Sequence, residues 1–128
     1  LLDLSMDQTC ALLDQLDDPA GWTEQTPDIA FMKVEGGPRV AAAVRGFVRM
    51  RAGVIYPDYK HFGDEYVFVL QGAYEDLDRG AWVVAGEGDH IPPGRSHTYR
   101  VPADGPDLLK VVVIHKGWRV LGHEHVAP

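Results

Sequence analysis

Two glycine-framed clusters in the middle of the chain contain side chains that can hold a divalent metal. The first cluster covers residues 53–72 and includes His61 and Glu65, and the second covers residues 86–97 and ends at His97. Two imidazoles and one carboxylate, set on strand-like segments, are the ligands of a metal site that keeps coordination positions open. The sequence therefore predicts a site for one divalent metal at these three residues.

Strand alternation places the Glu65 carboxylate in line with apolar side chains. Every second side chain of a strand points to the same face, so Glu65 shares a face with Val67 and Val69, and Tyr66 and Phe68 lie on the other. An isolated charge on the inner face of a sheet is costly. A bound metal ion removes that cost, which agrees with a ligand role for Glu65.

The rest of the chain consists mainly of short runs rich in Val, Ile and aromatic residues. Gly, Pro and Asp clusters separate these runs, which are Ile29–Val34, Val40–Arg51, Glu65–Gln71, Ala81–Ala85, His97–Val101, Leu108–His115 and Trp118–Leu121. Many short strands without intervening helices favour an all-β sandwich or barrel. We expect a single antiparallel β-barrel preceded by one helix.

Residues 5–17 predict that helix. Ser5 and Gln8 fit a capping box, and Asp17, Asp18 and Pro19 end the pattern. The expected packing stripe consists of Cys10, Leu13 and Leu16, with Leu12 beside it. We expect a structural N-terminal helix and linker over residues 1–22 and the barrel over residues 23–128.

The spacing of the two clusters resembles the two motifs of the cupin superfamily. Gly-x5-His-x-His-x3-Glu-x6-Gly covers residues 53–72, with Tyr59 in place of the first histidine, and Gly-x5-Pro-x-Gly-x2-His covers residues 86–97. The resemblance implies an RmlC-like jelly-roll barrel of roughly six to eight strands. It also implies that His61, Glu65 and His97 bind one divalent transition metal, namely Fe, Mn, Ni or Zn.

Two tyrosines lie beside the implied ligands. Tyr59 is either a ligand through its phenolate or a hydrogen-bonding or proton-transferring group. A phenol has an unperturbed pKa of about 10, and a nearby cation lowers it. Tyr99 shares the strand face of His97 and is the second candidate for proton transfer, although packing in the core is an equal alternative.

Within the superfamily, residues 56–76 look like the branch that contains ChrR-type anti-sigma sensor domains and small dioxygenases that cleave diketone or hydroxyketone substrates. The resemblance implies a small metal-dependent enzyme, of dioxygenase or lyase type, acting on a small oxygenated carbonyl compound. The alternative is a metal-binding sensor domain without catalysis, and a metal-free structural barrel is a third interpretation. We prefer the enzyme, because sensors of this type follow a zinc-binding helical domain that these residues do not contain.

Composition excludes several other functions. Nineteen acidic residues against 12 basic ones give a net charge of -7, which argues against a nucleic-acid partner. No apolar run is long enough for a membrane span, and the single cysteine, Cys10, excludes an internal disulfide. We expect a cytoplasmic protein that binds a small molecule. We also expect a homodimer, because exposed strand edges need covering.

Overall fold

The computed structural model describes the backbone of residues 1–94, 96–116, 118–120 and 123–125, and the side chains of residues 1–56, 62–94 and 98–116. Helices precede and interrupt a chain of short strands. The elements are α1 (Met6–Asp14), η1 (Pro19–Gly21), β1 (Thr23–Thr26), β2 (Ile29–Lys33), η2 (Pro38–Val40), β3 (Val44–Met50), β4 (Ile55–His61), β5 (Glu65–Gln71), β6 (Ala73–Asp76), β7 (Ala81–Val84), β8 (Gly88–Ile91), β9 (Ser96–Arg100), β10 (Leu108–Ile114), β11 (Trp118–Val120) and β12 (His123–His125).

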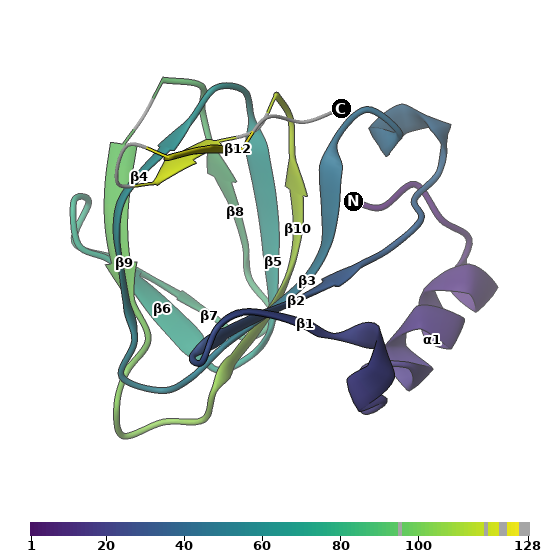
Figure 1. The fold of residues 1–128 in the computed structure, drawn as a ribbon, viewed down its shortest axis with the longest axis horizontal. Helices are drawn as coiled ribbons and strands as arrows, with labels where there is room; N and C mark the ends of the chain where they lie inside the picture. The colour runs from purple at the N-terminus through teal and green to yellow at the C-terminus, as the bar shows by residue number, and fades with distance from the viewer. Residues whose placement is uncertain (95, 117, 121–122, 126–128) are drawn as a thin grey trace.

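The strands form two antiparallel sheets that face each other. The first six-stranded sheet has the order β1-β2-β3-β10-β5-β8, and the second has the order β12-β11-β4-β9-β6-β7. Figure 1 shows β4 and β9 on one side of the core and β5, β8 and β10 on the other. The all-β, antiparallel jelly roll with one N-terminal helix is therefore confirmed. The strands form two open sheets, however, and outnumber those of the single small barrel that was expected.

The main apolar core lies between the two sheets. One sheet contributes Ile29, Met50, Val67, Val69, Ile91, Leu108, Val112 and Ile114, and the other contributes Tyr74, Val83 and Tyr99, with Val101 following β9. Even-numbered residues of β10 point into this core. Odd-numbered residues of β10 point to the opposite face of the sheet, where they join a second apolar cluster. Because β10 is central in its sheet and covered on both faces, its sequence is an almost continuous run of apolar residues.

The N-terminal segment covers the outer face of the first sheet. The capping box between Ser5 and Gln8 is confirmed, and the helix is shorter than expected. Leu12 and Leu16 pack against a cluster of buried residues on that face, whereas Cys10 and Leu13 are exposed. The packing expected for Leu16 and Leu12 is therefore confirmed, and that expected for Cys10 and Leu13 was wrong, because the partner surface decides which side chains of a short segment pack. The division into residues 1–22 and 23–128 stays a prediction.

Several elements differ from the sequence prediction for local reasons. Val40 ends the short 3-10 helix η2, and residues 41–43 follow it without forming a strand; β3 begins only at Val44. The predicted runs also lack β1, β6, β8 and β12, which are three or four residues long, and the seven-residue strand β4. Backbone pairing with neighbouring strands holds these strands in the sheet. Their own residues therefore need no apolar alternation, and the sequence gives little sign of them.

No helix in the described ranges has both the length and the apolar character needed to cross a membrane.

Candidate functional site

Glu65 begins β5 with its carboxylate in the core between the sheets. Its exposed fraction is 1%, and Val67 and Val69 on the same face are also buried. Tyr66 and Phe68 are about 40% and 39% exposed on the opposite face. The alternation predicted from the sequence is therefore confirmed, and it places a carboxylate among apolar side chains.

The other predicted site residues lie on β4 and β9 of the facing sheet. The backbone of Tyr59 is paired with that of His97, and His61 is paired with Trp118. The side chains of Tyr59, His61 and His97 lie outside the described residues. The structure thus brings the backbone of Tyr59 beside that of His97. The convergence of the ligand side chains stays a prediction.

A tight turn joins β4 to β5 and sets the spacing between His61 and Glu65. A Cβ atom on Gly63 would lie 2.5 Å from the carbonyl oxygen of His115, so no side chain fits at this position. The backbone N–H of His115 also donates a hydrogen bond of 2.9 Å to the carbonyl oxygen of Asp64. These contacts hold the start of β5 against the end of β10.

The described side chains alone do not form a metal site. Over residues 1–56, 62–94 and 98–116, no three His, Cys, Asp or Glu side chains gather around a common point. That part of the chain contains Glu65 but neither of the two predicted histidine ligands.

Tyr99 is the one predicted proton-transferring residue with a described side chain. Its exposed fraction is 4%, and its ring stacks on Tyr56 with centroids 5.5 Å apart. The hydroxyl accepts a hydrogen bond of 3.2 Å from Lys110 Nζ and donates one of 3.5 Å to Met50 Sδ. Burial raises the pKa of Tyr99, and the charge of Glu65 raises it further. The phenol is therefore protonated at neutral pH.

Lys110 is a site residue that the sequence analysis missed. It lies in β10 with an exposed fraction of 4%, and its amino group sits 4.5 Å from the Tyr99 ring centroid. Burial lowers the pKa of Lys110, and the charge of Glu65 opposes that shift. The signal was present in the sequence, because a lysine interrupts the apolar run Leu108–Ile114 at a position that alternation sends to the core.

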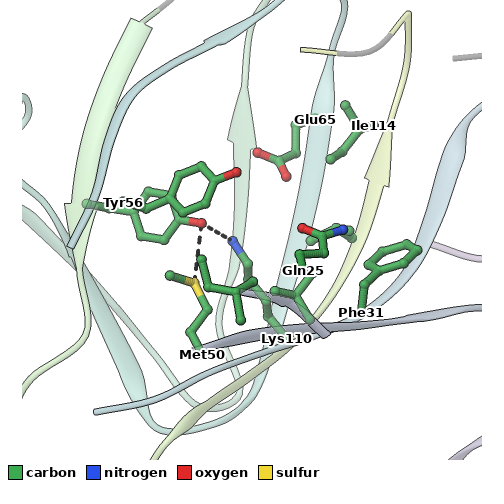
Figure 2. A pocket seen from close by; sticks show the side chains of 11 residues that line it. Gln25, Phe31, Met50, Tyr56, Glu65, Lys110 and Ile114 are labelled. Carbon is green, nitrogen blue, oxygen red and sulfur yellow. Dashed lines mark hydrogen bonds between the residues drawn. The ribbon is translucent and has the colours of Figure 1, made fainter. Parts of the chain in front are cut away.

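These polar groups line a small apolar cavity between the sheets. Its volume is about 60 Å³, and Figure 2 shows the Lys110 amino group and the Glu65 carboxylate reaching it from β10 and β5. The lining residues are Gln25, Ile29, Phe31, Val48, Met50, Tyr56, Glu65, Tyr99, Lys110, Val112 and Ile114. An acid, an amine and a phenol thus share one partly open cavity with apolar walls, which is the usual composition of a small-molecule site.

Comparison with known proteins identifies the fold. No family model and no curated protein sequence matches the chain. Among solved structures, an RmlC-like cupin protein from Ralstonia eutropha matches with a TM-score of 0.70 and 19% identity, over 84% of this chain and 71% of its own. An acetylacetone dioxygenase from Acinetobacter johnsonii matches with a TM-score of 0.68 and 12% identity, over 87% of this chain and 80% of its own.

A third similar structure is a regulatory complex. The Rhodobacter sphaeroides complex of SigE with the anti-sigma ChrR matches with a TM-score of 0.63 and 22% identity, over 87% of this chain and 67% of that one. Structural similarity at such low sequence identity is evidence for a shared fold and not for a shared activity. With its two facing antiparallel sheets and two glycine-framed motifs, the chain has the RmlC-like cupin fold.

Proposed function

We propose that the chain is a small metal-dependent enzyme that acts on a small oxygenated carbonyl compound. His61, Glu65 and His97 hold one divalent transition metal, either Fe, Mn, Ni or Zn. The observation that carries this proposal is the Glu65 carboxylate, buried to 1% exposure on the wall of an apolar cavity. Coordination to a metal is one of the few ways in which a protein tolerates a buried carboxylate.

The placement of the strands supports a shared site. Glu65 follows His61 after a three-residue turn, and His97 lies in β9, the strand paired with β4. Two imidazoles and one carboxylate suit each of the four metals. The donor set therefore fits the group that the cupin fold implies.

The chain's own residues bind the substrate and move protons around this metal. When bound, the metal supplies Lewis-acid polarisation of a carbonyl or enolate oxygen. Tyr99 holds a proton at Oη because burial keeps its pKa high, and a positioned phenol of this kind acts as a general acid. Tyr59 is a fourth ligand or a second proton-transferring group. Oxidative cleavage of the dioxygenase type is the first reaction class, and a lyase reaction is the second.

Elemental analysis of the purified protein tests the metal site. We expect about one transition-metal ion per chain and a higher melting temperature with metal than without it, because a ligand that binds only the folded state stabilises it. His97→Ala should lose the metal. His90→Ala is the matched control, since His90 stacks on Tyr66 on the outer face of β5, and it should retain the metal. A wild-type protein without metal and without metal-dependent stabilisation would contradict the proposal.

A sensor domain is the second candidate function. The likeness to the structure that contains the anti-sigma ChrR favours it. A sensor binds the metal without turning over a substrate, whereas a dioxygenase consumes O₂ when a suitable carbonyl compound is added. Oxygen uptake by the metal-loaded protein with a panel of small carbonyl compounds distinguishes the two candidates.

The proposal includes a homodimer located in the cytoplasm. The exposed Tyr66 and Phe68 side chains on β5 support the homodimer. Cell fractionation tests the location, and the experiment on the dimer is described with the whole molecule below.

A further inference from the structure

The Lys110 amino group has hydrogen-bonding capacity that the side chains described in the structure do not use. An ammonium group has three donors. Among the described residues, Nζ donates one hydrogen bond, to Tyr99 Oη at 3.2 Å, and forms no ion pair with a carboxylate. Its other neighbours are the ring faces of Tyr99 and Tyr74, with centroids at 4.5 and 5.4 Å.

The packing around Lys110 holds this amine in one place. The side chain projects inward from the centre of β10, between β3 and β5. The two tyrosine rings provide a cation-binding surface, and the hydrogen bond to Tyr99 sets the direction of Nζ. Figure 2 shows the Lys110 side chain among the side chains that line the cavity, with Nζ held by a dashed hydrogen bond. A ligand in the cavity therefore meets a fixed donor.

Charge balance determines which ligand suits this donor. With a divalent metal on Glu65, two neutral imidazoles and Tyr59 as a neutral phenol, the metal centre would keep a net positive charge, and the Lys110 ammonium group would add a second cation to the same apolar space. An apolar environment disfavours such an accumulation of charge unless counter-charge enters with it. Glu65 is the one acid among the lining residues of this cavity, and the metal would take up its charge. An anionic ligand is the group that completes the balance.

We propose that Lys110 is the substrate-binding cation of this site and that the substrate is a small organic acid whose carboxylate accepts a hydrogen bond from Lys110 Nζ. This inference rests on the proposed metal-dependent function, and it narrows the substrate class from carbonyl compounds in general to small oxo or hydroxy acids. The carbonyl end of such a molecule faces Glu65, and its carboxylate faces Lys110 and Tyr99.

The size of the cavity limits the rest of the molecule. A volume of about 60 Å³ holds roughly four to six water-sized groups, since one such group needs about 10–15 Å³. The aliphatic and aromatic walls favour a short hydrocarbon segment between the two polar ends. A long-chain or multiply charged acid does not fit these requirements.

Binding of butyrate and butanamide to the zinc-loaded protein tests the proposal. The two probes have similar shapes and differ in charge, and NMR titration of the labelled protein measures both affinities. We expect wild-type protein to prefer butyrate. Lys110→Met should weaken butyrate binding about 10- to 100-fold, the effect of losing a hydrogen bond to a charged group, with butanamide affinity and zinc content unchanged. Lys33→Met makes the same chemical change at an exposed position and should leave all three values unchanged.

The possible outcomes distinguish failure of the proposed metal site from failure of the proposed role of Lys110. Wild-type protein that retains no zinc or other metal would overturn both. Zinc-loaded protein that binds butyrate equally well with and without the Lys110 amine, or that prefers butanamide, would overturn only the role of Lys110. Loss of zinc from Lys110→Met would also overturn it, because the lysine would then maintain the metal centre. Lys110→Gln repeats the test with a polar side chain. If neither variant folds, a wild-type protein that prefers butanamide still overturns the role of Lys110.

Discussion

Three buried polar side chains meet on the walls of one apolar cavity. Glu65, Tyr99 and Lys110 each have an exposed fraction of 4% or less, and each is costly to bury without a polar partner. The Tyr99 hydroxyl connects two of its neighbours, because it accepts from Lys110 Nζ and donates to Met50 Sδ. The phenol thus holds the amine in place in addition to any role in proton transfer.

Removing the Tyr99 hydroxyl should therefore destabilise the protein through Lys110. We expect Tyr99→Phe to lower the free energy of unfolding by about 1–3 kcal/mol, because it leaves a buried donor without its acceptor. Urea denaturation measures this change. Tyr66→Phe, the same substitution at an exposed tyrosine, should change stability by less than about 0.5 kcal/mol.

The double variant provides a sharper check of the same pair. Replacement of both partners of a buried hydrogen bond by apolar groups can be nearly neutral. Tyr99→Phe combined with Lys110→Met should therefore be more stable than Tyr99→Phe alone. A double variant that is less stable than the single one would show that the hydroxyl does not act through the lysine.

At the scale of elements, the turn between β6 and β7 is tied to β8 of the other sheet. The buried Asp76 carboxylate accepts hydrogen bonds from the backbone N–H groups of Asp78 and Arg79, each at 3.1 Å, and from Arg79 Nε at 2.8 Å. Arg79 Nη2 also donates to Asp89 Oδ2 at 2.6 Å, and Tyr74 Oη donates to the same oxygen at 2.9 Å. One arginine therefore links a hairpin of one sheet to a strand of the other.

Loss of that arginine should be more damaging than loss of a neighbouring surface ion pair. We expect Arg79→Met to lower the free energy of unfolding by about 3 kcal/mol, the low end for a broken buried pair, since the side chain is partly exposed. Arg100→Met is the control, because Arg100 is half-exposed and pairs with Glu75 at 2.8 Å. Such a pair is worth less than about 1 kcal/mol. Equal losses in the two variants would contradict the linking role of Arg79.

The loss of stability in Arg79→Met should depend on pH, because Arg79 binds the ionised carboxylate of Asp89. Burial by itself raises the pKa of Asp89, but hydrogen bonds from Arg79 and Tyr74 outweigh it and lower the pKa below its ordinary value. A group with a depressed folded-state pKa stabilises the fold above its unfolded pKa and loses that contribution as the pH falls through the folded value. The difference in stability between wild type and Arg79→Met should therefore be largest near neutral pH and should shrink in acid.

At the scale of the whole molecule, one outer face of the first sheet remains apolar beside the N-terminal segment. Phe68 is 39% exposed, and a groove of about 350 Å³ next to it is lined mainly by Leu1, Leu2, Leu4, Leu13, Phe47, Leu70 and Val111. The neighbouring strand β8 is the last in its sheet. Exposed apolar patches and terminal strands are features that proteins cover by association.

The predicted homodimer should depend on this face. We expect light scattering to give the mass of two chains for the wild type, and Phe68→Ser to shift the protein toward the mass of one chain, because the substitution removes exposed aromatic surface. Trp82→Ser is the control, since Trp82 is an exposed aromatic residue on β7 of the other sheet. A wild type with the mass of a single chain at high concentration would contradict the prediction.

Features that depend on local patterns could be predicted from the amino-acid sequence. The capping box at Ser5 and the burial of Glu65 beside Val67 followed from spacing along one segment, because helix caps and strand alternation are local properties. The cupin resemblance likewise rested on the spacing within two short stretches. These predictions agree with the structure wherever their side chains are described.

Only the tertiary structure decided which distant groups share an environment. Lys110 and Tyr99 come from opposite sheets, and Arg79 reaches Asp89 across the two sheets, so no local pattern could pair them. The packing of Cys10 and Leu13 was also misjudged, because it depends on the surface of β2, β3 and β10 and not on the helix alone. Alternation determines whether a side chain points inward, and the packing of two sheets determines what it meets there.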